Sequence, residues 1–160
     1  MSHVANPGAR RVLVLGYGNP GRQDDGLGPA AAIAIGNLNL PGVTVCDNYQ
    51  LAIEDAIDVA AHDVIWFVDA ARYGAGPFEV EPVHAAAEMA FTSHLLKPEV
   101  LLAIAQGYYG CTPEAFLMGI RGYEFECIEQ ITPLAQANLT GALDVLTRRI
   151  SETVGAPARE

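Results

Sequence analysis

Apolar positions follow two alternating patterns along most of this 160-residue chain. Short apolar runs are typical of strands in a sheet that is covered on both faces. Apolar residues spaced by three or four favour helices instead. The predicted strands are 11–15, 43–47, 64–70 and 115–121. The predicted helices are 29–37, 51–62, a segment from His94 or Pro98 to Gln106, and 132–154.

This alternation of strands and helices predicts one α/β domain, with a mostly parallel twisted sheet and helices on both faces. Residues 77–83 alternate apolar and acidic side chains between prolines, which predicts an antiparallel edge strand. The length favours a single folding unit. We expect the domain to span 11–154, with flexible tails at 1–10 and 155–160.

The helical patterns also predict which side chains face the core. For the second predicted helix they are Leu51, Ile53, Ala56, Ile57 and Ala60. For the last one they are Leu134, Ala137, Leu139, Ala142, Leu143, Leu146 and Ile150. Thr132 followed by Pro133 is a favourable helix start.

Nineteen acidic and nine basic residues give a net charge of −10. Such a surface repels nucleic acid and anionic lipid, although it fits a partner with basic segments. No apolar run is long enough for a signal-peptide core or a membrane span, so we expect a cytoplasmic protein, with a monomer favoured. The three cysteines form no C-x-x-C pair and are predicted to be small buried residues: Cys46, Cys111 and Cys127.

Three polar residues follow predicted strands, where ligands gather in parallel sheets: Asp25, Asp69 and His94. Asp69 ends an apolar run, and a charge there is costly unless it is paired or bound to a metal. Two carboxylates and an imidazole suit nickel, iron or zinc and leave open positions for catalysis. The simpler alternatives are that Asp69 caps a helix or turn and that His94 is a surface or capping residue.

The segment GYGNPGRQDDGLGP, residues 16–29, contains the G-x-G-x-x-G spacing of dinucleotide-binding loops. Asp47 also ends the second predicted strand, about where a ribose-binding acid would lie. However, the predicted helix starts several residues after Gly21, and Asp24 and Asp25 would repel a pyrophosphate. One of these two aspartates is expected to be only a helix cap.

Four segments together resemble the hydrogenase maturation endopeptidases, over about residues 11–150. They are VLVLGYGNPGRQDDGLGP, VIWFVDAARYGAGPFEV, TSHLLKPEVL and AFLMGIRGYEFE. The resemblance implies an aspartic-type endopeptidase that removes the C-terminal extension of the [NiFe] hydrogenase large-subunit precursor. It also implies that Asp25, Asp69 and His94 are the catalytic and metal-contacting residues. The nickel would arrive with the substrate, so no resident cofactor is expected.

The chain departs from this family pattern after the second strand. Where many relatives have Asp-Gly-Gly-Thr, it has DNYQ, with Asn48 and Tyr49 in place of the two glycines. This change is expected to adjust which precursor fits. Two alternatives stay open: a nucleotide-binding α/β protein that uses the glycine-rich loop, and a non-catalytic nickel-binding chaperone of hydrogenase assembly.

Overall fold

The computed structural model describes residues 9–87 and 96–155. Its centre is a five-stranded sheet of β1 (Val12–Tyr17), β2 (Val43–Asn48), β3 (Val64–Ala71), β4 (Phe78–Pro82) and β5 (Glu114–Arg121). The strand order is β2-β1-β3-β5-β4. All neighbouring strands pair in parallel except β4, which pairs antiparallel with β5 at the edge. The predicted fold class and its antiparallel edge strand are therefore confirmed.

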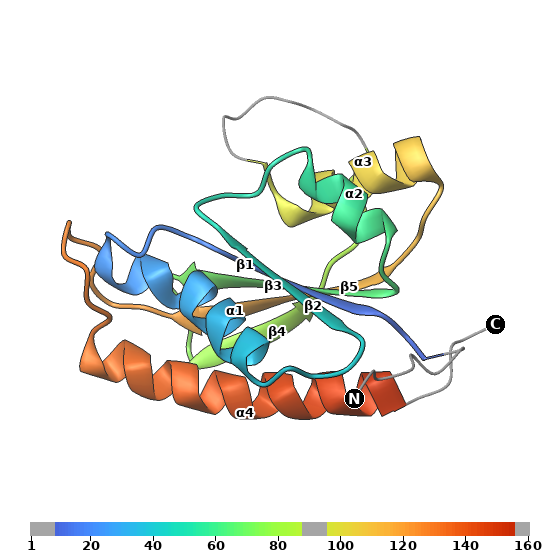
Figure 1. Ribbon diagram of the computed structural model, residues 1–160. Helices are drawn as coiled ribbons and strands as arrows, with labels where there is room; N and C mark the ends of the chain where they lie inside the picture. Colours follow the sequence, from blue (N-terminus) through green and yellow to red (C-terminus); the bar gives the residue numbers. More distant parts are fainter. Residues whose placement is uncertain (1–8, 88–95, 156–160) are drawn as a thin grey trace.

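Helices cover both faces of this sheet (Figure 1). The helices are α1 (Leu27–Asn37), α2 (Asp55–Ala60), α3 (Pro98–Tyr109) and α4 (Pro133–Gly155), and a short 3-10 helix, η1 (Gln23–Gly26), precedes α1. The pair α1 and α4 packs on one face, and the pair α2 and α3 packs on the other. Because successive side chains of a strand point to opposite faces, the sheet separates two apolar cores.

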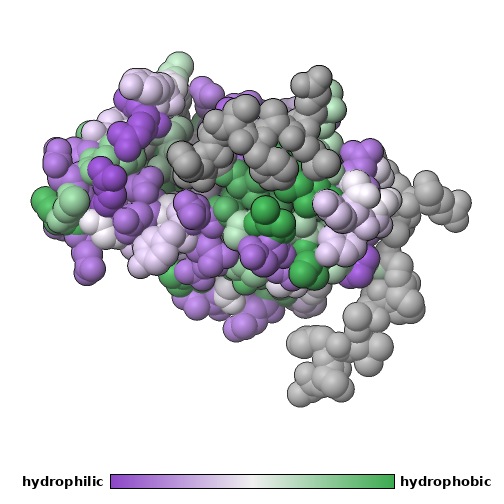
Figure 2. Space-filling view, turned by 90° about the horizontal axis from the view of Figure 1, so that it is seen from above, coloured by the Kyte–Doolittle hydropathy of each residue, from purple (hydrophilic) through white to green (hydrophobic). Residues whose placement is uncertain are grey.

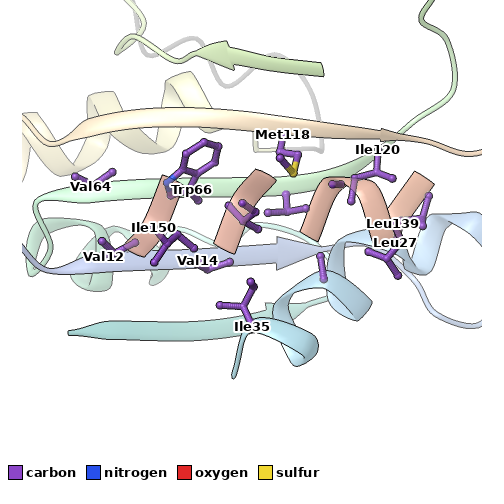
Figure 3. Packing of buried hydrophobic residues seen from close by; sticks show 14 of the residues in the cluster. Val12, Val14, Leu27, Ile35, Val64, Trp66, Met118, Ile120, Leu139 and Ile150 are labelled. Carbon is purple, nitrogen blue, oxygen red and sulfur yellow. The ribbon is translucent and has the colours of Figure 1, made fainter. Parts of the chain in front are cut away.

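The larger core lies between the sheet and the pair α1 and α4 (Figure 3). Trp66 and Met118 of the sheet face Leu27 of α1 and Leu139 of α4, and all four are buried. The smaller core lies under α2 and α3, where Phe67 is buried with the apolar residues of both helices. Burial on both faces explains why β1 and β3 are uninterrupted apolar runs in the sequence.

The exposure of several apolar residues differs from the prediction. In α4 the buried residues are Ala135, Leu139, Ala142, Leu146 and Ile150. These buried residues are spaced by three or four positions and lie on one side of the helix. Leu134 and Ala137 do not lie on that side and are exposed. Cys127 is also exposed, because it lies in the irregular segment between β5 and α4 rather than in a core.

The second predicted helix is shorter than expected, since α2 begins only at Asp55. Ile53 and Ile57 are exposed, whereas Leu51 and Ala56 are buried as predicted. Figure 2 looks onto the side of α2 and α3 and shows hydrophobic residues at the surface beside polar ones. Ile53 precedes the helix, and Ile57 lies outside the narrow stripe that six helical residues bury, so both side chains are in solvent.

The start of α1 packs unusually close to β1 and β3. A Cβ atom on Gly28 would overlap the backbone oxygens of Tyr17 and Val68, and one on Gly16 would overlap the backbone of Gly28. The two glycines thus set how near the start of the helix lies to the carboxyl ends of these strands.

Gly28→Ala is expected to lower the free energy of unfolding by about 3 kcal/mol or more, because neither neighbouring backbone can yield cheaply. Gly107→Ala is the matched control. It is also a helical glycine, but an added Cβ there meets nothing within 4 Å, so a gain of up to about 1 kcal/mol is expected. Urea unfolding of both variants measures the difference, and equal stability would contradict the packing argument.

Candidate functional site

The strand order places a switch point at the carboxyl ends of β1 and β3. The chain leaves β1 for β2 on one side and returns to β3 on the other, so the connections diverge between these two strands. Ligands of open α/β sheets bind at such a point. The loop before η1 follows β1 here, and Asp69 lies near the end of β3.

Asp69 lies beside Gly119 of β5 in the sheet register, and its carboxylate Oδ1 accepts a hydrogen bond of 2.8 Å from the Ala70 backbone. Burial raises the pKa of Asp69 to about 7, the Ala70 hydrogen bond lowers it, and the charge of Asp25 raises it further. A carboxyl group with this pKa exchanges protons near neutral pH. Such shifts are frequent at catalytic sites.

Asp25 lies in η1, and its Oδ2 accepts a 2.8 Å hydrogen bond from the backbone of Asn19. This bond closes the loop over the carboxyl end of β1. The charge of Asp25 contributes to the raised pKa of Asp69, although the two residues are 44 positions apart in the sequence. This effect is consistent with the predicted convergence of the two acids, which stays a prediction.

His94, the third predicted residue, lies outside the described residues. Within 9–87 and 96–155, no group of three His, Cys, Asp or Glu residues could hold a metal ion. The assignment of Asp25, Asp69 and His94 as one ligand set thus stays a prediction.

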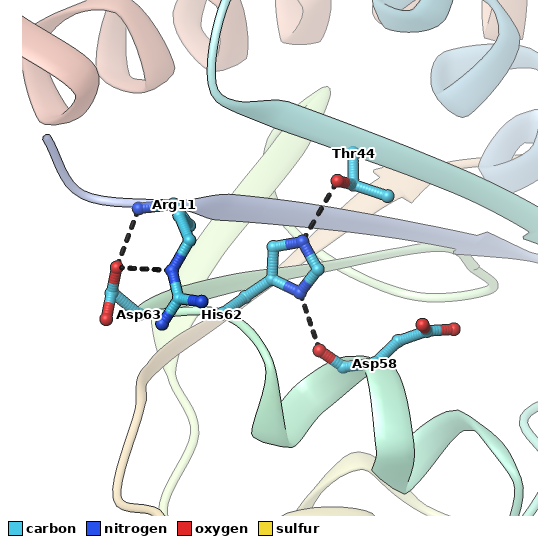
Figure 4. Close-up of polar contacts among 5 residues, drawn as sticks. All are labelled: Arg11, Thr44, Asp58, His62 and Asp63. Atoms are coloured by element: carbon cyan, nitrogen blue, oxygen red, sulfur yellow. Dashed lines mark hydrogen bonds and ion pairs between the residues drawn. The ribbon is translucent and has the colours of Figure 1, made fainter. Parts of the chain in front are cut away.

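Another histidine, His62, lies at the opposite edge of the sheet (Figure 4). Its Nδ1 lies 2.6 Å from the backbone oxygen of Asp58, and its Nε2 lies 2.9 Å from the Thr44 hydroxyl. It borders a cavity of about 570 Å³. Two ion pairs at that cavity, Arg11–Asp63 and Arg10–Glu114, neutralise much of its charge. We therefore place the functional site at the carboxyl edge.

Asp24, next to Asp25, has a structural role. It is fully buried, and its carboxylate accepts hydrogen bonds from the backbone N–H groups of Tyr123, Glu124 and Thr132 and from the Thr132 hydroxyl. Burial opposes ionisation, but these bonds outweigh it and hold the pKa of Asp24 below its ordinary value. Thr132 precedes α4, so Asp24 ties the acidic loop to the start of the last helix instead of capping η1 or α1.

The glycine-rich loop does not present free amides to a phosphate. Its backbone N–H groups, from Gly18 to Asp25 except Pro20, all donate within the protein. For example, Gly21 donates to the Asn19 side chain, and Gln23 donates to the backbone oxygen of Ile128. Phosphate-binding loops need such amides to point at the ligand. The geometry thus disfavours the nucleotide-binding alternative.

One further side chain beside Asp69, that of Tyr17, could not be identified from the sequence. Tyr17 ends β1 in the register position beside Asp69, because Gly16 pairs with Val68. Burial raises the pKa of the Tyr17 phenol, and the charges of Asp69 and of Glu99 at the start of α3 raise it further. The phenol therefore stays protonated and can donate a hydrogen bond. In the sequence Tyr17 resembles a core residue, and only the strand register identifies it.

Solved structures with the same fold include several hydrogenase maturation proteases. The protease HycI from Thermococcus kodakarensis superposes with a TM-score of 0.70 at 22% identity, covering 90% of this chain and 94% of that one. The endopeptidase HybD from E. coli has a TM-score of 0.67 at 22% identity, with coverages of 89% and 93%. An endopeptidase from Escherichia coli has a TM-score of 0.65 at 24% identity, with coverages of 93% and 98%.

No protein-family model matches the chain, and no curated protein sequence does either. At these identities the structural likeness establishes the fold, which is the one that the sequence resemblance implied. None of the helices among the described residues is both long and apolar enough to cross a membrane.

Proposed function

We propose that this protein is an endopeptidase that removes the C-terminal extension of a nickel-loaded [NiFe] hydrogenase large-subunit precursor. The proposal is supported above all by the positions of Asp25 and Asp69 after β1 and near the end of β3, where burial and the charge of Asp25 raise the pKa of Asp69 to about 7. The fold that the chain shares with solved maturation proteases supports it. In this proposal the protein acts in the cytoplasm as a monomer.

The nickel belongs to the substrate in this proposal. Asp25, Asp69 and His94 offer two oxygen donors and one nitrogen donor, a set that suits a divalent transition metal. Their contact with the substrate's nickel would dock the precursor and place the scissile bond over the carboxyl edge of the sheet. The metal would leave with the processed subunit.

The hydrolysis itself needs a group that accepts and returns a proton near neutral pH. In its ionised form, Asp25 or Asp69 would take a proton from water as the water oxygen bonds to the scissile carbonyl carbon. The carbon–nitrogen bond then breaks, and the proton passes to the departing amine. A carboxyl group with a pKa of about 7 is well matched to both steps.

Mass measurement of the precursor before and after incubation tests the proposal. We expect the mass to fall by that of the C-terminal extension when the precursor carries nickel, and to stay constant when it does not. Capture of the precursor on the immobilised protein should show the same nickel dependence. Nickel-dependent capture with no change in mass would instead identify a non-catalytic assembly chaperone, and capture that is indifferent to nickel would reject the docking model.

A further inference from the structure

Two cavities lie near the carboxyl ends of the strands. The first, about 210 Å³, is lined by Gly18, Pro20, Pro29, Asp47, Asn48 and Tyr49 at the ends of β1 and β2. The second, about 170 Å³, lies where β3, β5 and β4 meet and includes Asp69, Tyr73, Glu79, Glu81 and Arg121. Asp69 thus borders the second cavity, and the loop that leads to Asp25 borders the first through Gly18 and Pro20.

We propose that these cavities are the subsites for two substrate side chains that lie on opposite sides of the scissile bond of an extended polypeptide segment. This inference rests on the proposed peptidase function and adds the path of the substrate across the site. The segment runs across the strand ends from β2 towards β4, over Asp25 and Asp69.

The dimensions of the edge fit a polypeptide. Neighbouring strands lie about 4.8 Å apart, so the two cavities are separated by two to three strand spacings, or roughly 12 Å. An extended chain rises about 3.3 Å per residue and its alternate side chains point to the same side, so side chains about four positions apart reach both cavities. Each cavity holds one side chain and is smaller than the roughly 300–1,000 Å³ of a typical cofactor site.

An exposed tyrosine lies at each cavity. Tyr49 has 73% and Tyr73 has 86% of its surface exposed, so neither ring contributes much to the core. Tyrosine is enriched in binding surfaces, because its rigid ring buries a large area at little entropic cost and its hydroxyl finds polar partners. Tyr49 also stands where the resembled family pattern often has a glycine after the second strand, so a ring is present here in place of a bare backbone.

The charge of the cavities favours neutral or basic substrate side chains. The second cavity has the carboxyl groups of Asp69, Glu79 and Glu81 against the guanidinium of Arg121. The first has Asp47 as its charged residue. An acidic substrate side chain would be repelled at both, and the net charge of −10 adds to this effect.

The steady-state kinetics of precursor processing test the two anchors. Tyr49→Ala and Tyr73→Ala are each expected to raise KM about tenfold and to change kcat less than about twofold, since they bind substrate away from the reacting atoms. Tyr108→Ala is the matched control, because Tyr108 is 77% exposed near the end of α3, at the opposite edge of the sheet. An unchanged KM in both anchor variants would overturn the inference.

Photo-cross-linking separates this inference from the proposed function. In an Asp69→Asn background, p-benzoylphenylalanine replaces one tyrosine at a time: Tyr49, Tyr73 or Tyr108. The nickel-loaded precursor is the probe. The photoreactive residue at position 49 and the one at position 73 should cross-link to precursor residues on opposite sides of the cleavage point, and the one at position 108 should form no cross-link. Cross-links on the same side, or none from 49 and 73 while the Asp69→Asn protein still captures the nickel-loaded precursor, overturn the inference alone. No cleavage and no cross-link rejects the proposed function and this inference together.

Discussion

Asp69→Asn is expected to lower the rate of precursor cleavage about 10²- to 10⁴-fold while it makes the protein more stable. The rate falls because an amide cannot accept and return a proton, the role that we propose for Asp25 or Asp69. Asparagine keeps the size of the side chain and an oxygen that accepts from Ala70. The loss therefore reports the chemistry of the group rather than its packing, and single-turnover cleavage measures it.

The gain in stability follows from the raised pKa of Asp69, about 7 in the folded protein against 3.8 ordinarily. Below about pH 4 the carboxyl is protonated in both states and contributes no difference. Between pH 4 and 7 the folded state holds the proton that the unfolded state has lost, so stability falls as the pH rises. Above pH 7 the cost reaches up to about 4 kcal/mol, and Asp69→Asn removes it.

Denaturant unfolding of the metal-free protein at pH 4.5 and pH 8 checks this expectation. The free energy of unfolding of Asp69→Asn should exceed that of the wild type only slightly at pH 4.5 and by the largest amount at pH 8. If Asp69→Asn raised the free energy of unfolding equally at both pH values, ionisation of the buried Asp69 carboxyl group would not destabilise the wild type.

For the proposed ligand set, Asp25→Ala, Asp69→Ala and His94→Ala are each expected to abolish processing of the precursor. Full processing by all three variants would reject the assignment.

Asp24→Ala is expected to lower the free energy of unfolding by about 3–5 kcal/mol, the second large effect. The change removes the buried carboxylate that accepts four hydrogen bonds and leaves the donors of Tyr123, Glu124 and Thr132 without this partner. Because the pKa of Asp24 is lowered by folding, its stabilising contribution is present above about pH 4 and is lost as the pH falls further.

Asp25→Ala is the matched comparison, since the two aspartates are neighbours in the same 3-10 helix. It loses a single side-chain hydrogen bond, from Asn19, so its stability should fall by about 1 kcal/mol. Thermal unfolding at pH 7 distinguishes the two variants. If both variants lost the same stability, the hydrogen bonds to Asp24 would stabilise the protein no more than the single bond from Asn19 to Asp25.

The fold could be predicted because its central strands, β1 and β3, are buried on both faces. A run such as VIWFVDA has no polar face, and helical spacing on either side of such runs leaves one architecture, a parallel sheet between helices. The rule that ligands gather at strand carboxyl ends then singled out Asp25 and Asp69. Their position follows from the order of elements alone, without knowledge of side-chain contacts.

The remaining features depend on register and on distant contacts that spacing does not encode. The place of Tyr17 beside Asp69 requires the pairing of β1 with β3, and a tyrosine at the end of a buried strand otherwise resembles core. The adjacent aspartates could not be told apart, because the partners of Asp24 lie 99 to 108 positions further along the chain. His94 lies outside the described residues, so its role stays a prediction.

The anchoring of Asp24 also bears on the order in which the candidate site can form during synthesis. Because the acidic loop is fixed by residues 123, 124 and 132, it acquires its shape only after the last strand and the start of the closing helix have been synthesised. On the ribosome, the loop that carries Asp25 would therefore take its final form only once residue 132 is free to fold. Under the proposed function, shorter nascent chains would not process a precursor.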